Sequence, residues 1–125
     1  MSRRRNLEAE LLELIGEQAL FDLTEAYGGL DTIIPHEAHG SNLAQAIGNE
    51  AAAMMSRAYT GEQMSIPIAR DFRMREWLRR GQSKKWVAKH LGVSESAVYR
   101  TIKRVEKRGL RRDQLDLFAA DEDAA

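Results

Sequence analysis

Residues 83–104 read SKKWVAKHLGVSESAVYRTIKR. This stretch decides the fold of the C-terminal part of the chain, because it contains two short helical patterns separated by a tight turn. Gly92 allows the positive φ that such a turn needs. Ser83 and Ser94 stand where each helix begins, and a serine hydroxyl there accepts a bond from a free N–H of the first turn. The stretch predicts a helix, a sharp turn and a second helix.

Apolar spacing around this stretch extends the pattern to three helices. From Ile68 to Leu78 apolar residues recur at helical spacing, and Gly81 would end that helix. Ala88 is small where two helices would cross closely. The side chains predicted to share one core are Leu78, Val87, Leu91, Val93, Val98 and Ile102. We therefore predict a trihelical helix-turn-helix domain over residues 68–112.

Charge is segregated along the chain although its sum is zero. Residues 1–69 hold four Lys/Arg and ten Asp/Glu, a net charge of −6. Residues 70–112 hold fifteen Lys/Arg and four Asp/Glu, a net charge of +11. Residues 113–125 hold five acids and no base, which indicates an acidic, flexible tail. The basic segment favours double-stranded DNA as a partner. The alternatives are a solvated surface that happens to be basic and a trihelical domain that contacts another protein.

The outward face of the last helix has the character that a major-groove helix needs, small at its tip and cationic further along. The predicted base-reading residues are Ser96, Ala97, Tyr99, Arg100 and Lys103. Of these, Arg100 is the best candidate for a bidentate contact to guanine. The predicted phosphate contacts are Arg79, Arg80, Ser83, Lys84, Lys85 and Arg104. Phosphate contacts supply affinity and salt dependence without specifying sequence.

The first half of the chain contains an internal repeat with an offset of 32 residues. Residues 15–19 (IGEQA) return as residues 47–51 (IGNEA), and Ile34-Pro35 returns as Ile66-Pro67. The two prolines of the chain occupy the same place in each copy. Because two copies are too few for a solenoid, we interpret residues 14–35 and 46–67 as one duplicated small unit.

Each copy predicts a helix, a glycine stop and a short strand. Gly28-Gly29 and Gly61 stand where a helix would end in a left-handed residue. Residues 32–34 and 64–66 are then short strands, each closed by a proline. One such strand cannot stand alone, so the two must pair with each other or with a second chain. Gln63 and Ser65 would lie on the second strand, either within reach of an adjacent minor groove or simply paired.

A unit of this size has a small core, and dimerisation would enlarge it. We therefore predict a homodimer formed through residues 6–67. The apolar residues predicted to form its interface are Leu11, Ile15, Leu23, Tyr27, Ile34, Ile47, Met55, Tyr59 and Ile66.

The composition limits the class of protein. The 125 residues, of which 43% are hydrophobic and 30% charged, suit one or two small folded units. No apolar run reaches the roughly 18 residues of a membrane-spanning helix. The absence of cysteine excludes disulfides and thiolate chemistry. No glycine loop for phosphate, paired carboxylates or nucleophile–base arrangement indicates an enzyme. We expect a cytoplasmic, non-enzymatic protein without a cofactor.

The three histidines give little sign of a metal site. His36 and His39 are three residues apart between the two copies, with no further Cys or His nearby, so we expect a polar linker there. His90 is expected on a helix surface.

Several segments resemble the Mor family of phage transcription activators, the middle-operon regulators of Mu-like phages. They are Tyr59-Thr60-Gly61 through Ile66-Pro67, then Arg70 and Arg73, then residues 98–104 (VYRTIKR), in the order and spacing of that family. The resemblance covers roughly residues 40–108. It implies a dimer with an N-terminal dimerisation domain, an extended linker strand and a C-terminal helix-turn-helix. It also implies binding upstream of a phage promoter and recruitment of the host RNA polymerase.

The tail contains a second short motif. Gln114, Leu115, Leu117 and Phe118 resemble the peptide by which bacterial proteins dock into the pocket of the replication sliding clamp. The alternative is a final turn packed on the helix-turn-helix domain.

These patterns together predict a mainly α protein with a short β element. Its function would be that of a sequence-specific transcription regulator, a dimeric phage or prophage activator in the host cytoplasm and at its nucleoid. It would bind an imperfect palindrome near a promoter. The alternatives are a repressor and a DNA-bound adaptor in replication or host takeover. Which strand serves as the linker is open.

Overall fold

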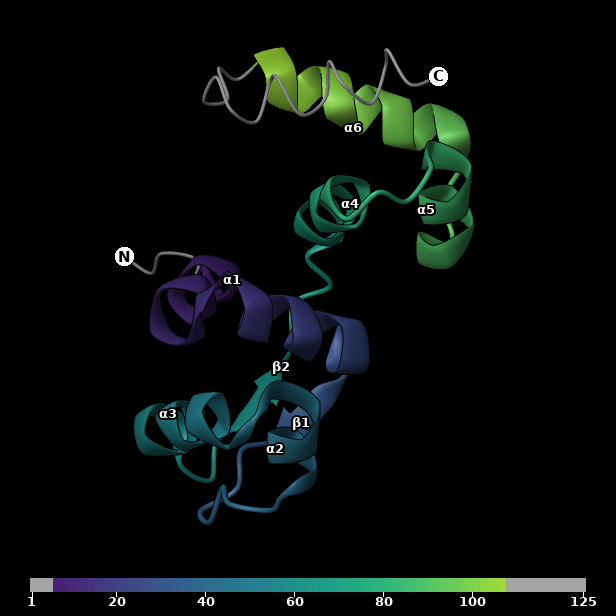
Figure 1. Cartoon of the computed structure of the whole chain (residues 1–125). Helices are drawn as coiled ribbons and strands as arrows, with labels where there is room; N and C mark the ends of the chain where they lie inside the picture. Colours follow the sequence, from purple (N-terminus) through teal and green to yellow (C-terminus); the bar gives the residue numbers. More distant parts are fainter. Residues whose placement is uncertain (1–5, 108–125) are drawn as a thin grey trace, which may run out of the picture. The chain divides into compact units, whose positions relative to one another are not determined.

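The structure is a computed structural model that describes residues 6–107, and the chain divides into two compact units, Met1–Ala69 and Arg70–Ala125 (Figure 1). Over the described residues, the fold is mainly helical, with six helices and one two-stranded antiparallel sheet. None of the helices in this part of the chain is long and apolar enough to cross a membrane. The acidic tail and the clamp-like motif of residues 114–118 lie outside the described residues.

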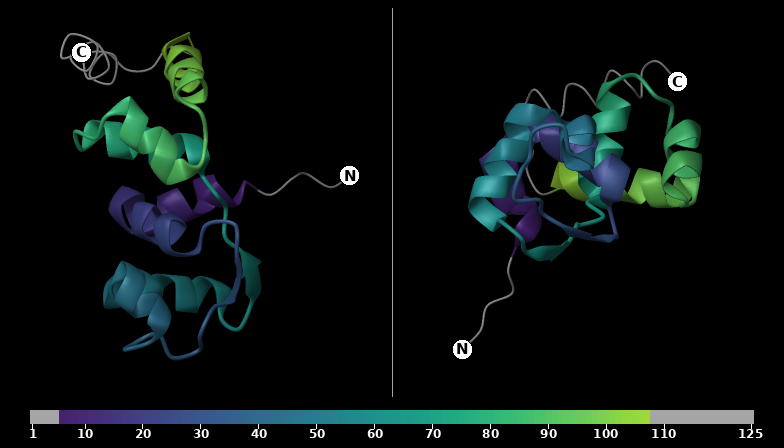
Figure 2. Two further views of the ribbon diagram at one scale, coloured as in Figure 1. Left: turned by 90° about the vertical axis from the view of Figure 1, so that its right-hand side faces the viewer. Right: turned by 90° about the horizontal axis from the view of Figure 1, so that it is seen from below.

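The N-terminal unit consists of three helices and two strands. In chain order they are α1 (Leu7–Tyr27), β1 (Asp31–Ile33), α2 (Asn42–Ile47), α3 (Asn49–Tyr59) and β2 (Gln63–Ser65). Helix α1 contacts both α2 and α3, and the left view of Figure 2 shows it as one layer above the other two. The strands lie one residue earlier than the sequence predicted, a shift within the ordinary uncertainty of element ends.

A glycine breaks the helix at the same position of each copy. Gly48 (φ 92°, ψ 155°) separates α2 from α3, and Gly16 (φ 86°, ψ 171°) interrupts α1 with non-helical dihedrals. The sequence predicted one continuous helix in each copy, and this was wrong. Both dihedral pairs lie in a region that is essentially restricted to glycine. The repeat therefore extends to the position where the helix changes direction.

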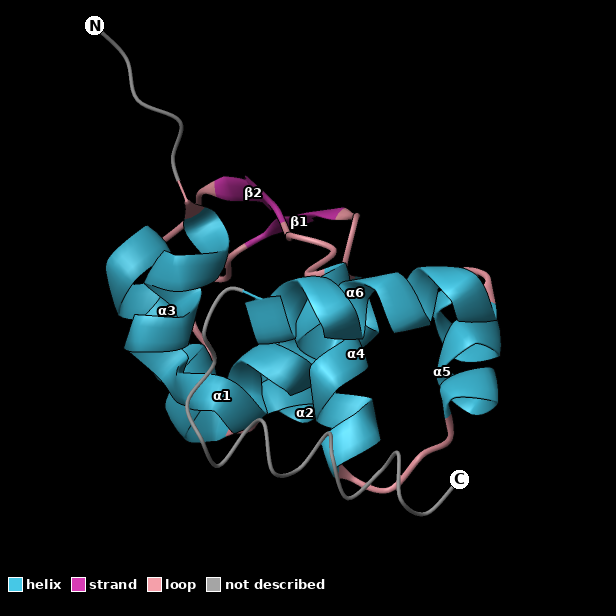
Figure 3. Cartoon of the chain, turned by 90° about the horizontal axis from the view of Figure 1, so that it is seen from above, coloured by secondary structure: helices cyan, strands magenta, loops and turns pink. Residues whose placement is uncertain are grey.

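The two strands of the N-terminal unit pair with each other (Figure 3). Thr32 faces Met64, and these two residues are equivalent under the offset of 32. Backbone hydrogen bonds around this centre come in matched pairs. Gly29 N donates to Ile66 O (2.8 Å) as Gly61 N donates to Ile34 O (2.9 Å). Ile34 N donates to Glu62 O (3.0 Å) as Ile66 N donates to Leu30 O (2.9 Å). The two copies are thus related by a local two-fold axis.

The core of the N-terminal unit repeats this symmetry. The equivalent positions at which both side chains are buried are Leu11 and Leu43, Ala19 and Ala51, Leu20 and Ala52, Leu23 and Met55, Thr24 and Ser56, and Ile34 and Ile66. The core is therefore built from both copies in equal measure.

This core contains most of the residues predicted to form a dimer interface. The structure buries six of the nine within the unit, namely Leu11, Leu23, Ile34, Ile47, Met55 and Ile66. Ile15, Tyr27 and Tyr59 are half-buried. A side chain enclosed by its own chain has no surface left for a partner. Their apolar character is therefore explained without a second chain, and their place in a subunit interface stays a prediction.

The C-terminal unit begins two residues after the predicted boundary and contains α4 (Arg70–Arg79), α5 (Lys84–Leu91) and α6 (Glu95–Lys107) (Figure 1). Ile68, predicted to start the first of these helices, lies outside it and is exposed. The core consists of Met74, Leu78, Val87, Ala88, Val98 and Ile102, with Trp77, Leu91 and Val93 packed against it. This is the core that the apolar spacing predicted, with Met74, Trp77 and Ala88 added.

Candidate nucleic-acid interface

The turn between α5 and α6 has the local geometry that its sequence predicts. Ser83 Oγ accepts a hydrogen bond from Trp86 N (3.0 Å), and Ser94 Oγ accepts one from Ala97 N (3.0 Å). Gly92 adopts the left-handed conformation (φ 70°, ψ 34°), and its N–H bonds back to the end of α5. These contacts satisfy backbone groups that helix ends leave free, and they fix the direction in which α6 leaves the turn.

Burial divides α6 into two faces. Val98 and Ile102 are almost fully enclosed in the core of the C-terminal unit, and Thr101 is buried beside them. Ser96, Tyr99, Arg100 and Lys103 are exposed, whereas Ala97 is half-buried. The exposed residues are four of the five predicted to contact bases. They share one side of the helix because its other side is fixed by the core.

The start of α5 and the first two turns of α6 border a common hollow of about 370 Å³. Its lining residues are Lys84, Glu95, Ser96, Tyr99 and Arg100. The sequence did not predict a binding role for Glu95, yet this residue lines the same hollow as the cations Lys84 and Arg100. A carboxylate can accept a hydrogen bond from the N4 amino group of cytosine. The signal available in the sequence was the position of Glu95, one residue after the cap Ser94 and therefore at the start of α6.

Among the exposed cations predicted to contact DNA, Arg100 and Lys85 differ from the rest. Neither makes a hydrogen bond or an ion pair with another described residue, so both guanidinium and ammonium groups can turn toward a ligand. Lys85 belongs to the first turn of α5, next to the cap Ser83. Helix N-termini attract phosphate through their free N–H groups and dipole. The Ser83 hydroxyl accepts from Trp86 N and keeps its own hydrogen for donation.

Three other predicted phosphate contacts are already engaged with carboxylates. Arg79 Nη2 lies 2.7 Å from Glu76 Oε1, and Arg80 Nε lies 3.9 Å from the same oxygen. Arg104 Nη2 donates to Asp71 Oδ2 at 2.8 Å, a contact between α6 and α4. The Glu76 side chain is only 10% exposed, so Arg79 compensates a mostly buried charge. This group therefore has a structural role that the sequence analysis did not assign.

Lys103 is held along its own helix. Its Nζ lies 3.6 Å from Glu106 Oε2 and 5.2 Å from the centre of the Tyr99 ring. An ammonium over an aromatic face is attracted by the ring quadrupole. Tyr99 and Lys103 thus form one amphipathic surface beside Arg100.

An aromatic cluster covers the junction of α4 and α5. Trp86 stacks on His90 (4.6 Å between ring centres, 15° between planes) and meets the edge of Trp77 at 4.8 Å. The guanidinium carbon of Arg80 lies 5.9 Å from the Trp77 ring. His90 is exposed on its helix, as predicted, and its imidazole is a packing group here.

Gln63 and Ser65, the predicted minor-groove residues, belong to the N-terminal unit. Both side chains are exposed on β2. Ser65 Oγ donates to Asp31 Oδ1 of the facing residue at 2.5 Å, while Gln63 faces Ile33. The strand is therefore paired, and its outward side chains are free of the core.

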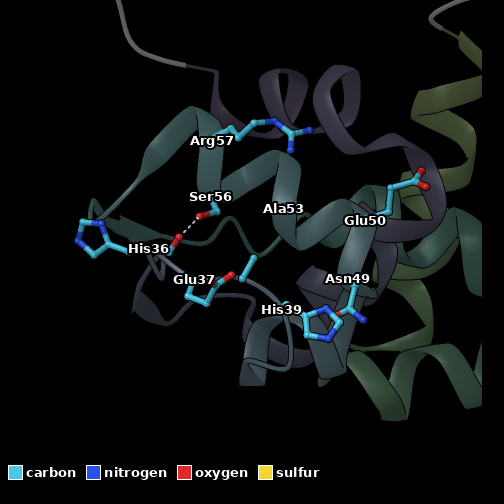
Figure 4. Close-up of a pocket in the computed structure, with 9 residues that line it drawn as sticks. His36, Glu37, His39, Asn49, Glu50, Ala53, Ser56 and Arg57 are labelled. Carbon is cyan, nitrogen blue, oxygen red and sulfur yellow. Dashed lines mark hydrogen bonds between the residues drawn. The ribbon is translucent and has the colours of Figure 1, made fainter.

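The loop between the copies borders a hollow of about 430 Å³ (Figure 4). His36 and His39 lie at opposite sides of it, and the Ser56 hydroxyl donates to the backbone oxygen of His36 at 3.0 Å. In the described part of the chain, no three His, Cys, Asp or Glu side chains come together as metal ligands.

Comparison with known proteins identifies a family for this chain. The family model described as the Mor transcription activator family matches residues 36–117, well over half of the chain. This span begins directly after the first copy of the repeat and includes the second copy and the three helices of the C-terminal unit. No curated protein and no solved structure matches the chain.

Proposed function

Because the chain belongs to the Mor transcription activator family, a family of non-enzymatic DNA-binding transcription regulators, we propose that it binds a specific promoter sequence through α6. The observation that carries the proposal is the division of α6 into a buried and an exposed face. Val98 and Ile102 fix the helix, and Ser96, Tyr99 and Arg100 remain for base edges in the major groove. The resemblance of the sequence to the Mor family also implied DNA binding through a C-terminal helix-turn-helix.

Arg100 is the residue assigned to base recognition. A guanidinium without an ion pair can donate two parallel bonds to O6 and N7 of guanine. Ser96 and Glu95, at the tip of the same helix, would reach neighbouring base edges in the same groove, and Glu95 would favour cytosine.

Phosphate contacts are assigned first to the start of α5. Ser83, Lys84 and Lys85 combine a hydroxyl, two cations and a helix N-terminus. Arg104 is a secondary contact, because its ion pair with Asp71 is exposed, contributes little and can exchange a carboxylate for a phosphate. Arg80 is also secondary, because its Nε lies 3.9 Å from the mostly buried carboxylate of Glu76. Arg79 is assigned to Glu76 rather than to DNA.

Regulation would follow from binding beside a promoter. Family membership favours activation by recruitment of the host RNA polymerase in a phage or prophage setting, with the protein at the nucleoid. A repressor is the alternative to an activator. The homodimer on an imperfect palindrome, which the sequence predicted, stays a prediction. The clamp-like motif Gln114-Leu115-Asp116-Leu117-Phe118 stays a prediction, and clamp binding that survives Leu117→Ala with Phe118→Ala would dispose of it.

The test is selection of binding sites from random duplexes at about 150 mM salt, followed by transcription from a promoter that carries the selected site. We expect one enriched sequence and a rise in transcript with bacterial RNA polymerase. Enrichment with a fall in transcript would make the protein a repressor. Binding without enrichment would contradict sequence recognition and support the adaptor.

A further inference from the structure

We propose that the N-terminal unit is a two-fold interface closed within one chain, so that the protein is a monomer that presents one recognition helix to one non-palindromic DNA element. Residues 6–35 then take the place that a second chain would fill. The DNA part of this inference rests on the proposed function, whereas the monomer part does not.

The hydrogen bonds around the sheet carry the argument. In a symmetric dimer, residue i of one chain contacts residue j of the other, and j contacts i. Here Gly29 bonds to Ile66 as Gly61 bonds to Ile34, and both bonds lie in a single chain. Thr32 faces its own equivalent, Met64, at the axis. The chain therefore already contains both halves of a symmetric interface.

The core shows that equivalent apolar positions of the two copies are buried against each other within one chain. Leu23 and Met55, at equivalent positions, are both fully enclosed, and so are Ile34 and, nearly, Ile66. From the sequence, we expected a second chain to enlarge the core, and a second chain was one of two alternatives for pairing the strands. In the structure, the first copy does both within the same chain. Dimerisation is no longer needed to bury these side chains.

The family match points the same way. It begins at residue 36, so the first copy lies outside the matched segment while the second copy lies within it. The first copy thus precedes the part of the chain that the family model matches. Its structural equivalence to the second copy identifies what it adds, namely an internal partner for that copy.

Charge opposes a further association through this unit. Residues 1–69 hold four arginines and ten acidic residues, a net charge of −6. Two such units brought together would repel each other. Only the second copy leads into α4, α5 and α6, so one closed unit carries a single helix-turn-helix.

A single recognition helix contacts one major-groove segment. Two-fold dimers select inverted half-sites whose centres lie about 10 bp apart or a multiple of that. A monomer would select one uninterrupted element with no inverted copy.

The first experiment is sedimentation equilibrium of the full chain from about 1 to 100 μM, a range that covers weak and moderate dimers. We expect the mass of one chain, 14.1 kDa, throughout. A mass of twice that value in this range would overturn the proposal, whichever surface is responsible.

The second experiment uses the absence of cysteine from the chain. Ile33 and Gln63 face each other on β1 and β2, and both side chains are exposed. They lie next to the hydrogen-bonded pair of Ile34 and Glu62, so they form a non-hydrogen-bonded pair of the antiparallel ladder. Such a pair has the Cα separation of a disulfide. We expect Ile33→Cys with Gln63→Cys to oxidise to a cross-linked single chain on a non-reducing gel.

The matched control is Asp31→Cys with Gln63→Cys, a diagonal pair about 7–8 Å apart that should stay reduced under the same mild oxidation. Disulfide-linked dimers of the facing pair would show that the strands pair between chains, and would overturn the closed unit.

The third experiment is the mass of the complex with the selected duplex. One chain per duplex and a motif without an inverted repeat support the inference. Two chains on a palindrome overturn it and leave the proposed function intact. If the chain is a monomer but enriches no DNA sequence, the closed N-terminal unit is supported and the proposed function is contradicted.

Discussion

The two units of this chain differ in whether their polar, apolar and charged groups are used within the unit or exposed to a partner. The N-terminal unit is duplicated and acidic, its strands are hydrogen-bonded between its own copies, and its buried apolar side chains come from both copies. The C-terminal unit is built once, around a small core, and carries its cations outward on α5 and α6. One region is closed and the other offers groups to a partner. Substitutions in the first should therefore change stability, and substitutions on the surface of the second should change binding.

The largest effect is expected from the shared core of the N-terminal unit. Leu23→Ala and Met55→Ala should each lower the free energy of unfolding by about 2–5 kcal/mol, because each leaves a cavity in an enclosed site. Urea unfolding followed by circular dichroism measures this. Leu12→Ala, at a partly exposed position of α1, is the control and should cost less than either. A Met55→Ala cost as low as the control would mean that the copies do not share one core.

The helix breaks should give the next largest effect. Gly48→Ala and Gly16→Ala should each cost about 1–3 kcal/mol of unfolding free energy, because alanine is strained at these dihedrals. A Cβ at either position meets no neighbouring atom, so the cost would come from the backbone alone. Gln45→Ala, on the exposed side of α2, is the control. An unchanged stability for Gly48→Ala would argue for a continuous helix after all.

On the C-terminal unit, Arg100→Ala should weaken binding to the selected duplex by about 1–3 kcal/mol and relax preference at one base pair. Fluorescence anisotropy with the selected duplex and its single-base variants measures both changes. Arg100→Lys keeps the charge and loses the bidentate geometry. It should therefore keep most of the affinity for the selected duplex but lose the preference for one base pair over its single-base variants. Equal loss on every duplex would make Arg100 a phosphate contact. The unfolding free energy should stay within about 0.5 kcal/mol.

The smallest effect is expected for Lys85→Ala. It should reduce the slope of log K against log salt by about one unit, since one phosphate contact is lost. Binding titrations at several salt concentrations give this slope. Arg104→Ala is the comparison and should change the slope less, because its guanidinium already pairs with Asp71. If the two variants behave alike, the Asp71 contact does not hold Arg104 away from DNA.

The parts of the fold that the sequence predicted depend on local chemistry. The caps Ser83 and Ser94 and the turn at Gly92 use bonds between residues that are close in sequence, so their pattern is visible in it. The repeat was visible for the same reason. The break at Gly48 was missed because the following residues continue the helical spacing and one glycine costs a helix only about 1 kcal/mol. Its recurrence as Gly16 was the available signal.

The parts that the sequence did not predict depend on pairing across the fold. A three-residue strand does not specify its partner, so intrachain and interchain pairing were both open until the register appeared. The contact of Arg104 with Asp71 joins residues 33 positions apart and follows from how α6 crosses α4. Without that crossing, every cation of the basic segment looked equally available for phosphate.

When one chain contains both halves of a symmetric interface, the two halves can differ in sequence. In a homodimer each substitution appears twice, so the two sides of the axis always change together. Here they have already diverged. The Thr24 hydroxyl donates to Leu20 O within its own helix, whereas its counterpart Ser56 donates to Pro35 O and holds the connecting loop. One half can thus specialise in organising the connection while the other remains a plain helix, a division of labour that two identical subunits cannot adopt.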